Sequence, residues 1–260
     1  MSEISAPVMF IGHGSPRWAL SPGAAAARLV EYSALFSNVK ALLVISPHWI
    51  TRGMRLTASS RPETIHDFGG FEKALYQLQY PVAGDPELAC HIQSVLQDSG
   101  LAVELDEERG LDHGVWVPLL HMLPDHRIPV LQLSLDAGST PDSLVKLGAQ
   151  LGQLRDEGVA IIASGSLTHN LYHMGEERAE PLDYVVRFQN WAREQVVARN
   201  ISALSQPHIE SDDFATAHPS AEHYLPLLIA MGASHDSDQL SVLQSSILYQ
   251  ALSMESYGWN

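Results

Sequence analysis

Three histidines follow short apolar runs of the sequence, and imidazole is a side chain that both binds metals and moves protons. His13 comes directly after VMFIG, His48 lies two residues after ALLVIS, and His169 lies five residues after VAIIAS. If these runs are parallel strands, their carboxyl ends share one edge of a sheet, where ligands of open α/β folds bind. We therefore predict that the three histidines converge on a shared site.

Neutral imidazoles bind zinc, Fe(II) and related first-row ions. The chain has 13 histidines and one cysteine, so histidine must supply most ligands of any metal. Three protein ligands with open positions are typical of a catalytic metal site, and a nearby histidine can transfer protons. Neither a G-x-S-x-G elbow nor a phosphate-binding glycine motif is present. The residues alone indicate an α/β enzyme with a polyhistidine metal site, and they leave the reaction open.

Three further histidines lie in similar surroundings. His113 lies in GLDHGVW before an apolar helix expected over residues 115–123, and His223 lies in SAEHYLPLL near the start of a late helix. His66 lies in TIHDFGGF beside Asp67. The remaining histidines are interpreted as surface or packing residues: His91, His121, His126, His173, His208, His218 and His235.

The elements that must position these residues follow from the hydrophobic pattern. Continuous aliphatic runs predict strands buried on both faces at Pro7–Gly12, Ala41–Ser46, Ile128–Leu135 and Val159–Ser164. Helices are predicted at Ala24–Phe36, Asp85–Gln97, Ser139–Arg155, Tyr184–Arg199 and Glu222–Met231. Arg55–Ala58, Ala102–Leu105 and Leu240–Leu243 are expected edge or antiparallel strands. The alternation predicts one α/β domain over residues 1–260, with a mainly parallel sheet covered by helices on both faces.

Composition narrows the class of partner. The formal net charge is −15, which argues against binding to nucleic acid or to an anionic membrane surface. Cys90 is the single cysteine, so the sequence predicts neither a disulfide framework nor a thiolate metal site. No stretch resembles a signal peptide or reaches membrane-spanning length, and we therefore expect a cytoplasmic protein.

Six motifs occur in the order found in class III extradiol ring-cleavage dioxygenases: FIGHGSP, ISPHW, TIHDFGGF, LDHGVWVPL, SGSLTHNL and EHYLPLL. The chain resembles most closely the 4,5-DOPA extradiol dioxygenase group within the superfamily of the protocatechuate 4,5-dioxygenase catalytic subunit. The resemblance runs from about residue 8 to the C-terminal ALSMESYGW. It implies one α/β domain that uses a non-haem metal and O₂ to open the ring of a catechol such as DOPA.

The resemblance also implies roles for individual residues. His13, His48 and His223 resemble the metal ligands. His169 resembles the acid/base histidine and is a candidate fourth ligand, and His113 resembles a second catalytic histidine of the pocket. The expected substrate-binding residues are His66, Asp67 and Asp112.

The implied dioxygenase chemistry requires Fe(II), because zinc has no redox chemistry, although the same histidines also suit Zn(II). A zinc-dependent hydrolase is therefore the alternative function. Two positions depart from the family pattern. Many class III enzymes use two histidines and a glutamate as ligands, whereas here the late ligand position has Glu222 followed by His223, and the histidine resembles the ligand. In addition, Glu72 stands where proline often follows Gly-Phe. The expected partners are a catechol and O₂, with the protein acting as a monomer or a homodimer.

Overall fold

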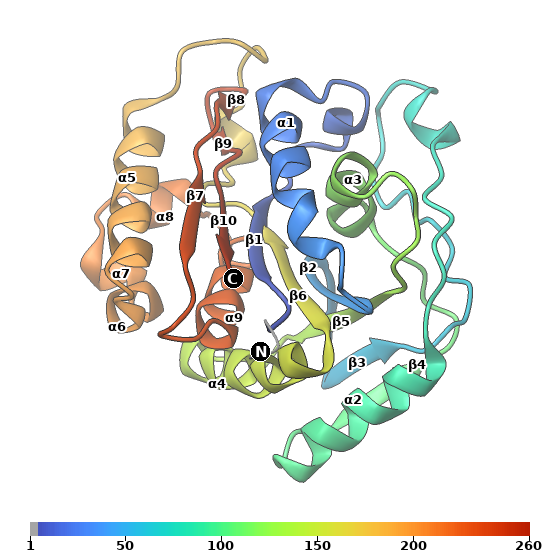
Figure 1. Ribbon diagram of the computed structural model, residues 1–260. Helices are drawn as coiled ribbons and strands as arrows, with labels where there is room; N and C mark the ends of the chain where they lie inside the picture. Colours follow the sequence, from blue (N-terminus) through green and yellow to red (C-terminus); the bar gives the residue numbers. More distant parts are fainter. Residues whose placement is uncertain (1–4) are drawn as a thin grey trace.

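Four parallel strands lie next to one another in the centre of the sheet, and three of them position predicted site residues. The computed structural model describes residues 5–260. β1 (Val8–Gly12), β2 (Ala41–Thr51), β5 (Val130–Asp136) and β6 (Val159–Gly165) are parallel, in the order β5-β2-β6-β1. His13 follows β1, His48 lies on β2 and His169 follows β6. All their carboxyl ends therefore lie at the same edge, toward the upper end of the strands in Figure 1. This confirms the parallel arrangement on which the shared site was predicted.

Shorter strands extend this core on both sides into an eight-stranded sheet, ordered β4-β3-β5-β2-β6-β1-β10-β7. β3 (Met54–Thr57) is antiparallel to β5 and parallel to β4 (Val103–Asp106). β10 (Ser256–Trp259) pairs antiparallel with β1, and β7 (Leu240–Leu243) with β10. The three predicted edge strands are thus confirmed within a residue, whereas β10 was not predicted. A separate small hairpin joins β8 (Ile247–Leu248) and β9 (Leu252–Ser253).

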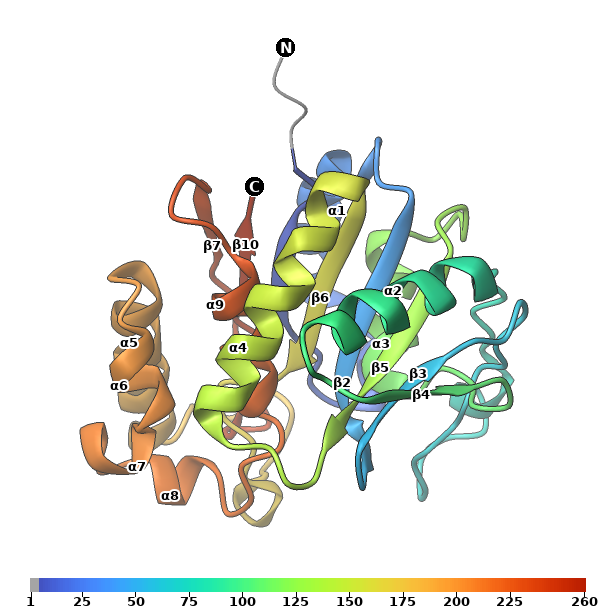
Figure 2. The same ribbon diagram turned by 90° about the horizontal axis from the view of Figure 1, so that it is seen from below.

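Helices cover both faces because alternate residues of each strand point to opposite sides. Val8 and Phe10 of β1 pack in the cluster that includes α2 (Pro86–Asp98), α4 (Pro141–Leu151) and α9 (Leu225–Ala233). Met9 and Ile11 pack in the cluster that includes α1 (Gly23–Tyr32) and α3 (His113–Met122). Figure 2 shows α2 and α4 lying across the strands. The predicted α/β fold with two helical layers is confirmed.

The remaining helices form the left flank of Figure 1. They are α5 (Asp183–Val197), α6 (Ile201–Ser205), α7 (Pro207–Glu210) and α8 (Phe214–Ala217). Short 3₁₀ segments occur at Pro16–Ala19, Ser33–Phe36, Leu75–Gln77, Gly152–Glu157 and Leu171–His173. Two of them replace the ends of predicted helices, since α1 stops at Tyr32 and α4 at Leu151.

Three boundary predictions were wrong next to site residues. The helix expected over residues 115–123 begins at His113, so this histidine is the first residue of α3. β2 does not end before His48 but continues to Thr51, across a register shift between Ile45 and Ile50 in its pairing with β5. The late helix was predicted to begin at Glu222, whereas α9 begins at Leu225. Proline is accommodated in the first turn of a helix, where its missing N–H costs nothing, and Pro226 therefore lies at the start of α9. His223 consequently lies in the turn that precedes the helix.

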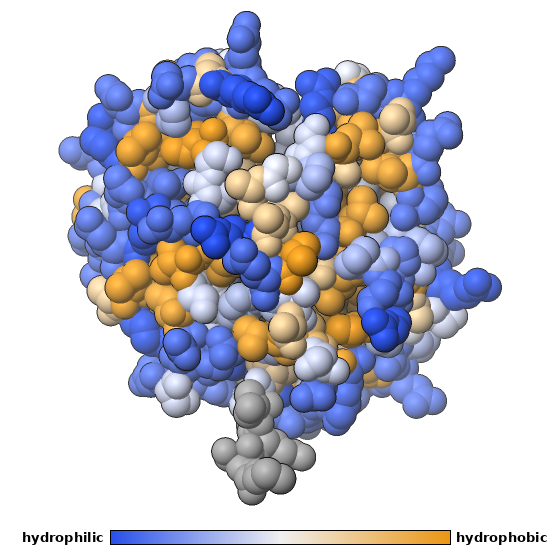
Figure 3. All heavy atoms as spheres, turned by 45° about the horizontal axis from the view of Figure 1, so that its top comes forward, coloured by the Kyte–Doolittle hydropathy of each residue, from blue (hydrophilic) through white to orange (hydrophobic). Residues whose placement is uncertain are grey.

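The face shown in Figure 3 carries hydrophilic side chains with several hydrophobic patches between them. Most large apolar side chains are buried in the two clusters on either side of the sheet. Across residues 5–260, no helix is both long and apolar enough to cross a membrane.

Candidate metal centre

The first site histidine leaves β1 through a tight turn at the sheet edge. His13 is 1% exposed, and its backbone N–H donates to the carbonyl of Gly165 at the end of β6 (3.0 Å). Gly14 adopts φ of +61°, a left-handed conformation that glycine reaches without steric cost. A Cβ at Gly12 would lie 2.9 Å from the carbonyl oxygen of Ser253. Glycine on both sides of His13 therefore allows the chain to turn and pack closely at this edge.

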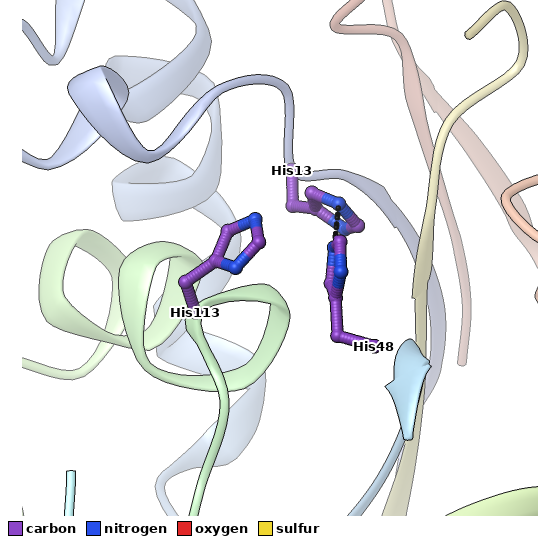
Figure 4. Close-up of side chains that lie close together, drawn as sticks. All are labelled: His13, His48 and His113. Atoms are coloured by element: carbon purple, nitrogen blue, oxygen red, sulfur yellow. Dashed lines mark hydrogen bonds between the residues drawn. The ribbon is translucent and has the colours of Figure 1, made fainter. Parts of the chain in front are cut away.

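His13, His48 and His113 bring one nitrogen each within 4.8 Å of one another. Figure 4 shows the three rings, which come from the turn after β1, from β2 and from α3, facing a common region. The Nε2 atoms of His13 and His48 are 3.1 Å apart. The ring of His113 lies 3.9 Å from that of His48 and 5.6 Å from that of His13, measured between centroids.

His223 and His169 complete the cluster. The His223 ring is 5.3 Å from His13 and 5.0 Å from His48, and it stacks on His169 at 3.4 Å with 7° between the ring planes. His223 also forms a second convergent group with His169 and Glu222. The structure thus brings together all five histidines that the sequence analysis placed in the metal or catalytic set.

Hydrogen bonds at the outer nitrogens fix which ring nitrogen faces inward. The Ser164 hydroxyl donates to the carbonyl of Gly114, so it accepts a bond from Nδ1–H of His13 (2.8 Å). Nδ1–H of His223 donates to Glu222 (3.2 Å). In both rings the protonated nitrogen is Nδ1, and Nε2 keeps its lone pair. This is how second-shell partners orient histidine ligands toward a metal.

Burial keeps four of the five histidines neutral. Loss of solvation, reinforced by the neighbouring histidines, holds the pKa of His13 and of His223 well below the usual value. Burial and the proximity of His113 lower the pKa of His48 to about 3, although Asp67 opposes this. Burial lowers the pKa of His169 to about 4. Neutral imidazole is the form that binds metal ions.

These residues fit a first-row metal ion. The Nε2 atom of His223 is buried and has no hydrogen-bond partner among the described residues, an arrangement that is costly without a ligand. A tetrahedral ion with metal–nitrogen bonds of about 2.0–2.1 Å holds its ligand nitrogens about 3.3 Å apart. The 3.1 Å separation of the His13 and His48 Nε2 atoms is close to that spacing.

The three expected substrate-binding residues have different surroundings. Nε2–H of His66 donates to the carbonyl of Leu78 (2.9 Å), which ties that ring to the protein backbone. Asp112 is wholly buried and accepts bonds from Ser46 (2.8 Å) and Gln132 (2.5 Å). Asp67 contacts the cluster directly through His113.

Asp67 accepts two bonds from one residue. Its Oδ1 accepts the backbone N–H of His113 (2.8 Å), and its Oδ2 accepts Nδ1–H of the same residue (2.9 Å). Burial raises the pKa of Asp67, but the side-chain and backbone hydrogen bonds from His113 help to outweigh this effect and hold that pKa at about 2. The carboxylate is therefore ionised at neutral pH.

The sequence analysis missed the serines that support the histidines. Ser46 and Ser164 lie in aliphatic strand runs, are 0% exposed, and bond to Asp112 and to His13 respectively. Their signal is a hydroxyl inside a run that is otherwise buried and apolar. A buried hydroxyl needs a partner, so such a serine marks a nearby polar network.

Comparisons with known proteins show the family of this chain. The family model described as the catalytic LigB subunit of aromatic ring-opening dioxygenase matches residues 26–259. A 4,5-DOPA dioxygenase extradiol of Escherichia coli (strain K12) is 34% identical over 259 residues, covering 98% of this chain and 94% of that protein. The protein of the same name from Beta vulgaris is 36% identical over 241 residues, covering 91% of this chain and 90% of its own.

A solved structure is similar over the whole chain. The crystal structure of an uncharacterized protein from Escherichia coli K12 matches with a TM-score of 0.81 and 28% identity, covering 98% of this chain and 100% of the other. The family match spans most of the chain, and both named relatives exceed 30% identity. The chain belongs to the family of aromatic ring-opening dioxygenases of the LigB type, within the class III extradiol enzymes that its motifs resemble.

Proposed function

We propose that the protein is an Fe(II)-dependent extradiol dioxygenase that opens the ring of a catechol such as DOPA. The observation that carries this proposal is the set of largely buried imidazole nitrogens that lie close together at the carboxyl edge of the sheet. Support for the substrate class comes from relatives named 4,5-DOPA dioxygenase extradiol. A bound Fe(II) would supply the redox chemistry that brings catechol and O₂ together, which zinc cannot supply.

His13, His48 and His223 are the proposed ligands. The outer nitrogens of His13 and His223 donate to Ser164 and Glu222, so both rings present Nε2 to the centre of the cluster. His169 suits a different role, because its ring stacks on His223 with nearly parallel planes. Two parallel rings direct their in-plane lone pairs side by side, so they do not meet at one ion. We therefore favour His169 as a group that moves protons over His169 as a fourth ligand.

His169 and His113 are the proposed catalytic residues. Burial keeps His169 neutral at physiological pH, so it can accept a proton from a catechol hydroxyl and return one later. His113 is 6% exposed and lies beside His48, within reach of a molecule held at the cluster. For His66 and Asp112, direct substrate contact becomes a weaker proposal, because protein groups already bond to Nε2 of His66 and to both carboxylate oxygens of Asp112.

The remaining proposals concern domain organisation, location, oligomeric state and partners. We propose that residues 1–260 act as one catalytic domain in the cytoplasm, as a monomer or a homodimer. A net charge of −15 supports a small-molecule enzyme without a nucleic-acid or membrane partner.

Oxygen uptake tests the proposed function. Metal-free protein is loaded anaerobically with Fe(II) or Zn(II) and then mixed with O₂ and a catechol panel that includes DOPA. Only the Fe(II) protein should consume O₂, one molecule for each ring opened, with a new absorbance from the product. Tyrosine, which has one ring hydroxyl, is the matched negative substrate. The absence of uptake with every catechol would contradict the proposal and favour a zinc hydrolase.

A further inference from the structure

Asp67 lies outside the five-histidine cluster and is hydrogen-bonded directly to it. Its side chain is 17% exposed, and both carboxylate oxygens accept hydrogen bonds from His113, as described above. The same Oδ2 atom is 3.7 Å from Nδ1 of His48. One carboxylate therefore faces the outer side of two histidines that come from different elements, α3 and β2.

The first of these bonds caps a helix. His113 is the first residue of α3, and Asp112 at the N-cap position makes no side-chain capping bond. Free N–H groups at a helix start attract anionic acceptors, and the helix dipole adds to that attraction. Asp67 supplies the acceptor from a distant loop, which ties His113 to the loop at the backbone.

The second bond selects the tautomer of the His113 ring. An ionised carboxylate only accepts, so the ring nitrogen facing Asp67 must carry the proton. Nδ1 of His113 is therefore protonated, and in the neutral ring Nε2 carries the lone pair. With Nε2 free, the ring can accept a proton from a substrate hydroxyl; the other tautomer can only donate from that position.

The loop that holds Asp67 is braced on both sides of the carboxylate. The Ile65 backbone exchanges bonds with α3 and its approach, since its N–H donates to Leu111 (2.8 Å) and its carbonyl accepts from Trp116 (2.9 Å). Phe68 packs edge-on against the His113 ring at 5.7 Å. The bond from His66 to the Leu78 carbonyl anchors the following segment. The carboxylate is thus held in place before any substrate arrives.

We propose that Asp67 is the positioning residue of the active site, which sets the orientation and tautomer of His113 rather than binding substrate. This inference rests on the proposed function for its catalytic consequence, while the hydrogen-bond geometry stands independently. It differs from the substrate contact expected from the sequence, because both oxygens of Asp67 are already engaged by one residue.

Asp67→Asn tests this role with little change in shape. The amide oxygen can still accept the His113 backbone N–H and so keep the cap. The amide nitrogen is a donor, however, and it requires a lone pair on Nδ1, which moves the ring proton to Nε2. A reversal of this kind at a carboxylate–histidine pair lowers kcat by about 10⁴-fold in serine proteases. We expect kcat to fall by about 10²–10⁴-fold here, with KM changed by less than about threefold.

The decisive readout is the histidine tautomer. Nitrogen NMR of histidine-labelled, zinc-loaded protein should show His113 protonated at Nδ1 in the wild type and at Nε2 in Asp67→Asn. Wild-type His113 protonated at Nε2 would overturn the proposal, even if the variant fails to fold. A large rise in KM at unchanged kcat would also overturn it, because that result marks a substrate contact.

Asp85→Asn is the matched control. It removes one carboxylate at the N-cap of α2, where asparagine caps about as well as aspartate. Neither kcat nor the His113 tautomer should change in this variant. The NMR measurement also separates the two proposals: wild-type protein that consumes no O₂ with any catechol contradicts the dioxygenase, whereas the tautomer result does not depend on turnover.

Discussion

Buried polar groups at the two ends of the central strands differ in how completely they are hydrogen-bonded. At the amino end, Arg155 is 1% exposed and directs its donors to the carbonyls of Ala6 and Ala233 and to both oxygens of Asp238. At the carboxyl end, the Nε2 atoms of His13 and His48 face each other, and that of His223 has no partner among the described residues. Groups whose polar atoms are all hydrogen-bonded hold the structure together, whereas a buried ring nitrogen without a partner, such as Nε2 of His223, is available to a ligand.

The contrast has an energetic meaning. A buried polar atom without a partner costs about 1–3 kcal/mol, so the carboxyl edge is less stable than it would be if it were apolar or fully bonded. The five residues of β1 separate the two edges by about 16 Å, at about 3.3 Å per residue. Substitutions at one edge should therefore act independently of the other. The predictions below test this separation.

The largest effect is expected from removing a ligand. His13→Ala should abolish stoichiometric binding of Fe(II) or Zn(II) and all turnover, because it deletes one of three proposed ligands and opens the others to water. Metal content after desalting and isothermal titration measure the loss. His208→Ala, an exposed histidine of α7, is the control and should retain metal and activity. A His13→Ala, His48→Ala double variant that keeps one metal per chain would contradict the ligand assignment.

The next largest effect is expected at the catalytic histidines. His169→Ala should keep the metal and lower kcat by about 10²–10⁴-fold, the range of general acid–base catalysis. Its stacked contact with His223 adds a modest packing effect on metal affinity. Steady-state kinetics, with the metal content quantified in the same sample, separate the loss of proton transfer from the loss of metal. If His169→Ala instead loses its metal as completely as His13→Ala, His169 is a ligand.

The third prediction concerns Arg155 at the amino edge of the sheet. Arg155→Met leaves the Asp238 carboxylate without its partner and should lower the free energy of unfolding by about 3–5 kcal/mol. Urea denaturation measures this change. Activity per folded molecule and metal content should equal those of the wild type, because the pair lies at the opposite edge from the histidines. A specific loss of metal in the folded variant would contradict the independence of the two edges.

The sequence predicted the parts of this molecule that depend on local pattern. The aliphatic runs give β1, β2, β5 and β6, and their shared parallel direction places His13, His48 and His169 at one edge. β10 escaped prediction because SYGW is short and its burial comes from pairing with β1, more than 240 residues away in sequence. Family motifs, rather than periodicity, were needed to add His223 and to name the chemistry.

The tertiary contacts of the site were beyond sequence reasoning for the same reason. Asp67 and His113 are 46 residues apart, and Ser164 and His13 are 151 apart. No local pattern indicates which nitrogen of a histidine a remote carboxylate or hydroxyl will bind. The sequence thus predicted the residue types of the centre, but the orientation of each ring depends on partners that only folding brings close.

The smallest expected effect is a pH dependence confined to the amino edge. Burial raises the pKa of Asp238, but hydrogen bonds from Arg155 and the His235 backbone outweigh it and hold that pKa below its usual value. A carboxyl with a lowered folded-state pKa adds stability that is fully present above its unfolded pKa of about 3.9 and is lost as pH falls through the folded value. In urea denaturation, the difference in the free energy of unfolding between wild type and Asp238→Asn should be constant from about pH 5 to about pH 7. This whole range lies about one unit or more above the unfolded-state pKa. At lower pH, this difference in the free energy of unfolding should become smaller. If the difference in the free energy of unfolding stays constant through the acid range, Asp238 contributes through packing. The stability of the amino edge would then come from side-chain packing rather than from the ion pair.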